Sequence, residues 1–237
     1  MKSAAVIKYD IKFQFRHGFY YVYIIITLSY IAFLNLLPFG LRTPAAVLVV
    51  FTDPCVLGFF FIGGIVLFEK GQGVFQNLFI TPFRLHDYLI SKTLSLSLLS
   101  ISAAYAILLC TFGFNFNPLM LFIGVTLSSF LFTLIGLTLA VRVYTLNQYL
   151  LASIFYVLPL MLPLVDFLGL VQSPLFYLLP AKPSLILIGG AITGGTDTGE
   201  VIYAVLALSA WIGIAYIWAY RWFYRYVIRR IGGGNGQ

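Results

Sequence analysis

The segment Phe68–Lys92, FEKGQGVFQNLFITPFRLHDYLISK, is the longest interruption of an otherwise apolar chain, and the apolar run on each side of it is long enough to cross a bilayer. Gly71 and Gly73 are expected to end the preceding helix. The apolar residues that follow recur with the spacing of one helical face: Val74, Phe75, Leu78 and Phe79. Thr81 precedes Pro82 and is therefore disfavoured in the α conformation, which ends this short helix. The pattern predicts a surface helix with one apolar face.

The composition of the 237-residue chain is that of an integral membrane protein. Hydrophobic residues make up 61% of it, charged residues only 9%, and the mean hydropathy is +1.00. Cys55 and Cys110 both lie in apolar runs, so neither a disulfide framework nor a Cys-x-x-Cys metal pair is expected. The first 18 residues lack the apolar core and cleavage site of a removable signal peptide. The first membrane helix is therefore expected to remain as the insertion signal.

Runs of about 20 apolar residues, the length that crosses a bilayer as a helix, recur along the whole chain. They predict an all-α integral membrane protein, with residues 1–237 forming one transmembrane domain. The six predicted transmembrane helices are Phe19–Leu37, Ala45–Phe68, Thr93–Gly113, Leu119–Val141, Leu150–Leu170 and Val201–Tyr220.

Basic residues are distributed unequally between the two sides that these spans define. With six spans both termini share a side, and 12 of the 14 lysines and arginines fall on it. The other side receives only Arg42 and Lys182. The positive-inside rule therefore predicts a multi-pass protein of the plasma membrane with both termini, and segment 69–92, in the cytoplasm.

Basic segments flank the spans at both ends of the chain. Residues 1–18 carry Lys8, Lys12 and Arg16 on one helical stripe, which predicts an N-terminal interfacial helix that contacts lipid phosphates. An apolar stripe adjoins it: Ala4, Ile7, Ile11 and Phe15. Residues 221–237 interleave arginines with aromatic side chains. In a soluble protein this would suggest RNA, but at the end of a membrane span it is typical of an interface anchor, so the expected partner is the lipid bilayer and not nucleic acid.

The fifth span and the segment after it are irregular. Pro159 and Pro163 should kink or break the span, because each removes a backbone hydrogen bond. Residues 171–199 then contain two apolar stretches, Pro174–Leu179 and Pro183–Ile192, that are too short to cross a membrane. They predict a re-entrant hairpin that enters the outer leaflet from the extracellular side.

Asp53 is an acidic residue within the second predicted span. Intramembrane acids are functional candidates, because burying a carboxylate there is costly. Asp53 also precedes Pro54, and this pair is typical of the first positions of a helix. Both readings stay open: Asp53 is either a helix cap at a kink or a group that lines a transport path.

Several motifs of the opening segment together resemble a known family. Glu69-Lys70 at the end of a span, a glycine turn, a short helix ending in Thr-Pro, and Tyr88–Lys92 (YLISK) are similar to ABC-2 type transporter permease subunits, in particular the fluoroquinolone-export-permease-like group. The resemblance implies that the short helix is a coupling helix that docks on a separate ABC ATPase, in place of the simpler reading as a solvated cytoplasmic loop. The positions that match this ATPase-coupling segment are Glu69, Lys70, Gln72, Phe75, Leu78, Thr81 and Pro82. It also implies extracellular re-entrant helices and a second copy of the chain or a related permease.

No motif for nucleotide or metal chemistry is present in the sequence. The Walker pattern, a zinc-binding His-Glu-x-x-His and a Ser-His-Asp set are all absent. We therefore expect no enzyme activity and no cofactor on this chain, with ATP and magnesium on the partner ATPase.

The sequence thus predicts the permease subunit of an ATP-driven exporter that moves an amphipathic or drug-like substrate out of the cell by alternating access. The expected substrate path is aromatic and weakly polar, and its candidate residues are Tyr23, Thr27, Asn35, Asp53, Phe60, Phe61 and Tyr156. Two alternatives stay open: a secondary carrier or substrate-binding membrane module not coupled to an ABC ATPase, and a membrane-embedded enzyme.

Overall fold

The computed structural model describes residues 2–53, 57–76 and 84–228, and every regular element within these ranges is helical, as expected from the composition. The elements are α1 (Lys2–Arg16), α2 (Phe19–Leu36), α3 (Phe39–Thr52), α4 (Gly58–Gly71), α6 (Leu85–Phe112), α7 (Pro118–Ala140), α8 (Leu146–Leu160), α9 (Pro163–Phe167), the 3-10 turn η2 (Pro174–Leu178), α10 (Ala181–Thr193), α11 (Thr198–Phe223) and the π-helical turn η3 (Tyr224–Ile228).

Among the described residues, four helical segments are long and apolar enough to cross a bilayer: α2, α6, α7 and the continuous stretch of α11 and η3. They coincide with the first, third, fourth and sixth predicted spans. Two of them are longer than predicted. α6 begins at Leu85 instead of Thr93, and Lys92, which lies before the predicted start, has buried partners within the bundle. The helix of the sixth span continues past Tyr220 to Ile228, since no glycine or proline interrupts it there.

The second predicted span is divided into two shorter helices. α3 ends at Thr52 and α4 begins at Gly58, and Asp53 and Leu57 between them are π-helical, so the regular α-helix is interrupted near Asp53, as predicted. Asp53 itself has a right-handed helical backbone (φ −59°, ψ −61°), and its N–H donates to the carbonyl of Val49. An N-cap has an extended backbone. The cap reading of Asp53 is therefore not the geometry observed.

The fifth predicted span is divided as well. α8 begins earlier than predicted, at Leu146, because the Thr145 hydroxyl accepts a hydrogen bond from the Gln148 N–H and caps the helix. It ends at Leu160, and Pro163 occupies the first turn of α9, where a missing N–H costs nothing.

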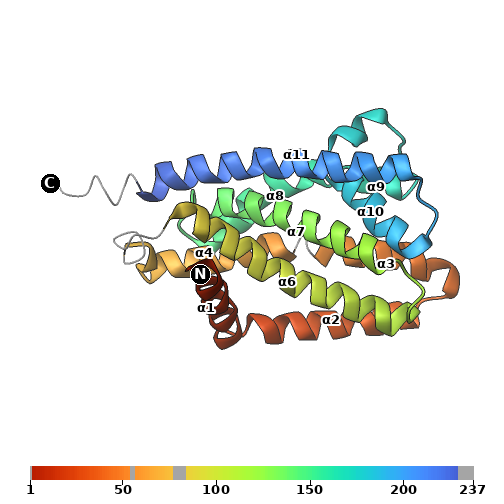
Figure 1. Cartoon of the computed structure of the whole chain (residues 1–237), viewed down its shortest axis with the longest axis horizontal. Coiled ribbons are helices and arrows are strands. Elements are labelled where there is room, and N and C mark those ends of the chain that lie inside the picture. The colour runs from red at the N-terminus through yellow and green to blue at the C-terminus, as the bar shows by residue number, and fades with distance from the viewer. Residues whose placement is uncertain (1, 54–56, 77–83, 229–237) are drawn as a thin grey trace.

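Figure 1 shows the long helices lying side by side along one axis, while α1 runs across them at one end. Gly18, with a left-handed φ of 82°, makes the turn from α1 into α2. The end of the bundle that carries α1 also carries the end of α4, the start of α6 and the end of α11, and is called here the terminal end (Figure 1). The opposite end carries α9 and α10.

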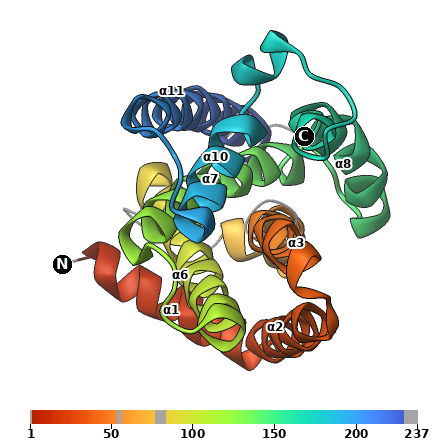
Figure 2. The ribbon, with the colours of Figure 1, turned by 90° about the vertical axis from the view of Figure 1, so that its right-hand side faces the viewer.

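Helix α7 lies in the centre of the bundle and contacts α4, α6, α10 and α11 (Figure 2). Close approach to α4 depends on Gly136, where a β-carbon would lie 2.6 Å from Ile62 and 2.9 Å from the Phe59 carbonyl oxygen. On the other side, Gly124 lies against Leu187 of α10. Small residues at such positions allow helices to pack closely within a membrane.

The predicted re-entrant region contains two short elements, η2 and α10, as expected. α10 packs against α3, α7 and α11 at the opposite end, and most of its apolar side chains are buried. It is therefore part of the bundle and not a surface loop.

Candidate coupling and transport site

A buried group of charged side chains joins three helices at the terminal end. Lys92 Nζ donates hydrogen bonds to Asp10 Oδ1 at 2.6 Å and to Glu69 Oε1 at 2.5 Å, while the Tyr88 hydroxyl donates to Glu69 Oε2 at 2.6 Å. These residues come from α1, α4 and α6, and all four are buried. We call Asp10, Glu69, Tyr88 and Lys92 the ionic cluster.

The buried charges of the ionic cluster are stabilised by pairing with one another. Charges taken out of water are costly unless they are paired and hydrogen-bonded. Lys92, only 2% exposed, is the one cation between two carboxylates, and it lies within cation–π distance of the Phe13 and Tyr88 rings. Lys92 thus links both α1 and α4 to α6.

The face that α1 turns to the bundle combines buried polar side chains with Phe13, which packs against the core. Asp10 and Gln14 are buried, and Gln14 Nε2 donates to Ser95 Oγ of α6 at 2.8 Å. Phe15, from the predicted apolar stripe, is exposed. The reason is that α6 offers polar partners at this level, which satisfy Asp10 and Gln14 better than lipid could.

Lys70, the neighbour of Glu69, is used within the chain. Its ammonium group donates to the carbonyl oxygens of Val141 and Val143, at 3.1 Å and 2.9 Å, and lies over the Tyr144 ring. These carbonyls follow the C-terminus of α7, where a cation is favoured by the helix dipole. Lys70 therefore fixes the end of α4 to the α7–α8 connection.

Phe75 lies inside the bundle, although the pattern suggested a face directed at a partner. Its ring is 4% exposed and packs edge-on against Tyr88 (5.8 Å between centroids) and Phe223 (5.4 Å). Gln72 is exposed. The remaining residues of the predicted coupling segment, Leu78, Thr81 and Pro82, lie outside the described residues. Of the predicted coupling residues, the structure thus brings Glu69 and Phe75 together on Tyr88.

Sequence reasoning missed part of this cluster. No motif in the sequence marks Asp10, and only the family motif points to Tyr88 and Lys92. Two signals could have found them: a single acid within the basic helix 1–18, and a lysine followed directly by a long apolar run. Each is a charge whose sequence neighbours cannot neutralise it, which predicts a partner elsewhere in the chain.

A second polar group lies deeper in the bundle. The Tyr23 hydroxyl donates to Asp53 Oδ2 at 2.8 Å, and Ser100 Oγ lies 3.0 Å from the same hydroxyl. Since the Tyr23 proton is used on Asp53, Ser100 is the donor in the second bond. Asp53 is fully buried, and its Oδ1 has no hydrogen-bond partner among the described residues. This group, called here the Asp53 site, joins α2, the end of α3 and α6.

The other predicted path residues do not all gather at the Asp53 site. Thr27 lines a cavity of about 360 Å³ between α2 and α6, next to Tyr23. Asn35 is exposed near the end of α2, where its amide donates to the Ile31 carbonyl. Phe61 packs edge-on against Tyr23, with 5.3 Å between ring centroids.

Phe60 and Tyr156 lie elsewhere. Phe60 packs edge-on against Tyr149 of α8. Tyr156 stacks on Trp218 of α11, 5.9 Å between centroids, and accepts a hydrogen bond from Arg142. The predicted path residues therefore do not form one site within this chain. Tyr23, Thr27, Phe61 and Asp53 lie close together, whereas Asn35, Phe60 and Tyr156 lie elsewhere.

Among the described residues, no group of three or more histidines, cysteines and acids could hold a metal ion. Several long apolar helices define a multi-pass membrane protein.

The chain belongs to the Fluoroquinolones export permease protein family, whose sequence profile matches residues 1–231. It is similar to the fluoroquinolones export permease proteins of two strains of Mycobacterium tuberculosis, CDC 1551 / Oshkosh and ATCC 25618 / H37Rv. Each is 30% identical over 189 residues, which cover 78% of this chain and 78% of the relative. The family resemblance drawn from segment 69–92 is confirmed.

Proposed function

We propose that this chain is the membrane-spanning subunit of an ATP-driven exporter that moves amphipathic, drug-like molecules of the fluoroquinolone class out of the cell. In this proposal α3 with α4, and α8 with α9, are the second and fifth of six spans, and both termini lie in the cytoplasm. ATP and magnesium act on a separate ABC ATPase. The observation that carries the proposal is the ionic cluster, because it joins the two ends of segment 69–92, which belong to α4 and α6, to each other and to α1 at the terminal end.

The ionic cluster provides a route for mechanical work. An ATPase that binds the segment after Gly71 would displace the end of α4. Through Glu69 and Lys92 that displacement reaches α6, and through Asp10 it reaches α1. Phe75 adds a contact to Phe223 of α11. Four helices thus respond to one contact surface, as alternating access requires.

The Asp53 site is the proposed counterpart within the membrane. Because α3 and α4 are separate helices, α4 can tilt relative to α3 at the interruption, and Tyr23 connects this point to α2. A change at the terminal end would then alter the surroundings of Asp53, where the substrate path is expected. We assign Asp53 to the path and not to a cap.

A second copy of the chain, or a related permease, is the proposed partner within the membrane. α2 presents large apolar side chains to the outside, among them Ile25 (63% exposed) and Leu28 (60% exposed). α8 does the same through Leu151 and Phe155. Lipid and a partner permease are the two environments that such faces fit.

The test is ATP-dependent uptake of ciprofloxacin into inside-out vesicles that contain this chain and its co-expressed ATPase. We expect uptake that requires ATP and both proteins, and that persists when a protonophore collapses the proton gradient. The variant Glu69→Gln should still co-purify with the ATPase but should reduce transport per ATP hydrolysed. Uptake by this chain alone would refute the proposal.

One observation favours a secondary carrier as a second candidate. Asp53 is a buried intramembrane acid, and such acids carry protons in many transporters. The same vesicle experiment separates the two candidates, because a carrier would be inhibited by the protonophore and would not need the ATPase.

A further inference from the structure

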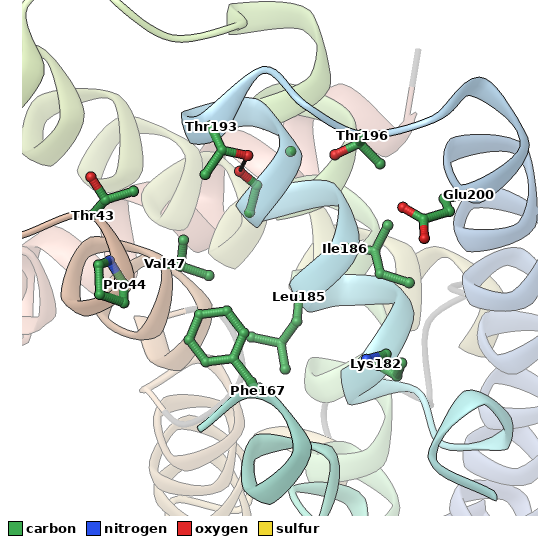
Figure 3. Close-up of a pocket in the computed structure, with 12 residues that line it drawn as sticks. Thr43, Pro44, Val47, Phe167, Lys182, Leu185, Ile186, Thr193, Thr196 and Glu200 are labelled. Atoms are coloured by element: carbon green, nitrogen blue, oxygen red, sulfur yellow. Dashed lines mark hydrogen bonds between the residues drawn. The ribbon is translucent and has the colours of Figure 1, made fainter. Parts of the chain in front are cut away.

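A cavity of about 360 Å³ lies at the end of the bundle opposite the chain termini (Figure 3). α3, α9, α10 and the start of α11 line this open cavity, and no residue of the Asp53 site is part of it. Its apolar wall includes Val47, Phe167 and Leu185, and two charged side chains, Lys182 and Glu200, complete it. Figure 3 shows the apolar side chains between α3 and α10, with Glu200 on the side of α11.

The two charged residues are not equivalent. Lys182 forms a hydrogen-bonded ion pair with Asp166 and also lies 5.1 Å from the centre of the Tyr177 ring, so its charge is compensated. Glu200, in the first turn of α11, makes no ion pair or hydrogen bond within the part of the chain that the structure describes. The helix dipole favours a negative charge at that position. The cavity therefore has an apolar wall and one solvent-exposed carboxylate that has no cation paired with it among the described residues.

The other charged residues near the cavity do not pair with Glu200. Arg42, at the same end, directs its guanidinium to the Asn35 and Leu37 carbonyl oxygens at the end of α2 and to the Phe39 ring. Asp197 uses its carboxylate to cap the Gly199 N–H. Neither residue lines the cavity.

We infer that this cavity binds an amphipathic molecule that carries a protonated amine. The amine pairs with Glu200, and the apolar or aromatic body lies against Val47, Phe167 and Leu185. This inference rests on the proposed export function and deepens it, because it names the chemical group that the far end of the transport route recognises. A cavity of this volume is in the range that holds a drug-sized molecule.

The test is equilibrium dialysis of the purified full-length chain, without ATPase, against two quinolones. Ciprofloxacin carries a basic amine and a carboxylate, whereas nalidixic acid has the carboxylate without a basic amine. We expect Glu200→Gln to weaken ciprofloxacin binding about fivefold, the scale of one partly exposed ion pair, and to leave nalidixic acid unchanged. Asp197→Asn is the matched control, since it removes the same charge three residues away and keeps a good cap.

A second variant tests the cavity by volume. A β-carbon at Gly189 would meet only Val47, at 3.9 Å, so Gly189→Ala should fold normally and serves as the folding control. Gly189→Phe should fill the space and abolish binding of both quinolones. A thermal unfolding scan shows whether Gly189→Phe is folded. If that variant is unfolded, the binding data for Glu200→Gln decide whether the cavity binds the amine. Equal effects of Glu200→Gln and Asp197→Asn, or none from either, would overturn the inference.

The experiments distinguish failure of this inference from failure of the proposed function. If ATP-driven efflux holds but Glu200→Gln binds ciprofloxacin normally, only the inference fails. If binding depends on Glu200 but efflux does not need an ATPase, only the proposed function fails. Phosphatidylethanolamine also carries a protonated amine, whereas phosphatidylglycerol does not. Displacement of ciprofloxacin by the first lipid but not by the second would show that a lipid headgroup can also occupy the site.

Discussion

At the residue scale, the buried ion pairs of Lys92 make the sharpest prediction. Lys92→Met leaves Asp10 and Glu69 buried without a cation, which should destabilise the protein by about 3–5 kcal/mol. Adding Asp10→Asn and Glu69→Gln should restore much of that loss, because the uncompensated charges are then removed. Thermal unfolding in detergent measures both changes. Lys8→Met, on an exposed lysine of α1, is the control. An unchanged melting temperature for Lys92→Met would contradict the observed pairing.

A second prediction at this scale concerns Tyr23 and Asp53. Because the Tyr23 hydroxyl donates to the buried carboxylate, Tyr23→Phe should cost about 1–3 kcal/mol. In an Asp53→Leu background, where no acceptor remains, the same change should cost much less. A double-mutant cycle of unfolding free energies should give an interaction of about 1 kcal/mol or more. Additive effects of the two changes would show that the bond contributes nothing.

At the scale of elements, α4 and α8 meet at a contact that distinguishes two adjacent glycines. A β-carbon at Gly63 would lie 2.3 Å from the Tyr149 ring, whereas one at Gly64 would meet nothing nearer than 4.0 Å. Tyr149 is fully buried and donates to the Phe59 carbonyl at 2.7 Å, so it cannot move away easily. Gly63→Ala should therefore destabilise by about 1–3 kcal/mol. Gly64→Ala should be neutral or stabilising by up to about 1 kcal/mol, because alanine favours helix. Unfolding scans of the two variants side by side provide the measurement, and similar behaviour would contradict this packing.

The elements also show how far sequence reasoning reaches. The long spans were predictable, since about 20 apolar residues leave a helix few alternatives. So were the interruptions near Asp53 and Pro163, because proline removes a backbone donor. The direction of a side chain was not predictable from one helix alone. Phe75 packs against Phe223, Lys70 donates to the Val141 carbonyl, and Asp10 accepts from Lys92. In each pair the two residues are far apart in the sequence. Such pairings become visible only once the helices are assembled.

At the scale of the whole molecule, the orientation in the membrane is a prediction that chemical labelling can check. With the native cysteines Cys55 and Cys110 replaced by serine, single cysteines are placed at Gln72 and Thr193, both exposed and at opposite ends of the bundle. A membrane-impermeant maleimide added to intact cells should label Thr193→Cys and spare Gln72→Cys. Both should react in disrupted cells. The reverse pattern would place segment 69–92 outside the cell and exclude any contact with a cytoplasmic ATPase.

The pairing of Asp10 with Lys92 has a consequence for biosynthesis. The two residues are 82 positions apart, so the aspartate leaves the ribosome long before its lysine is made. The buried position of Asp10 in α1 can form only after α6, which carries Lys92, has been made. The basic stripe predicted for residues 1–18 would let α1 lie at the lipid headgroups until then. Loss of Lys92 should therefore impair assembly of the chain before any transport takes place, because α1 would lack its buried partner.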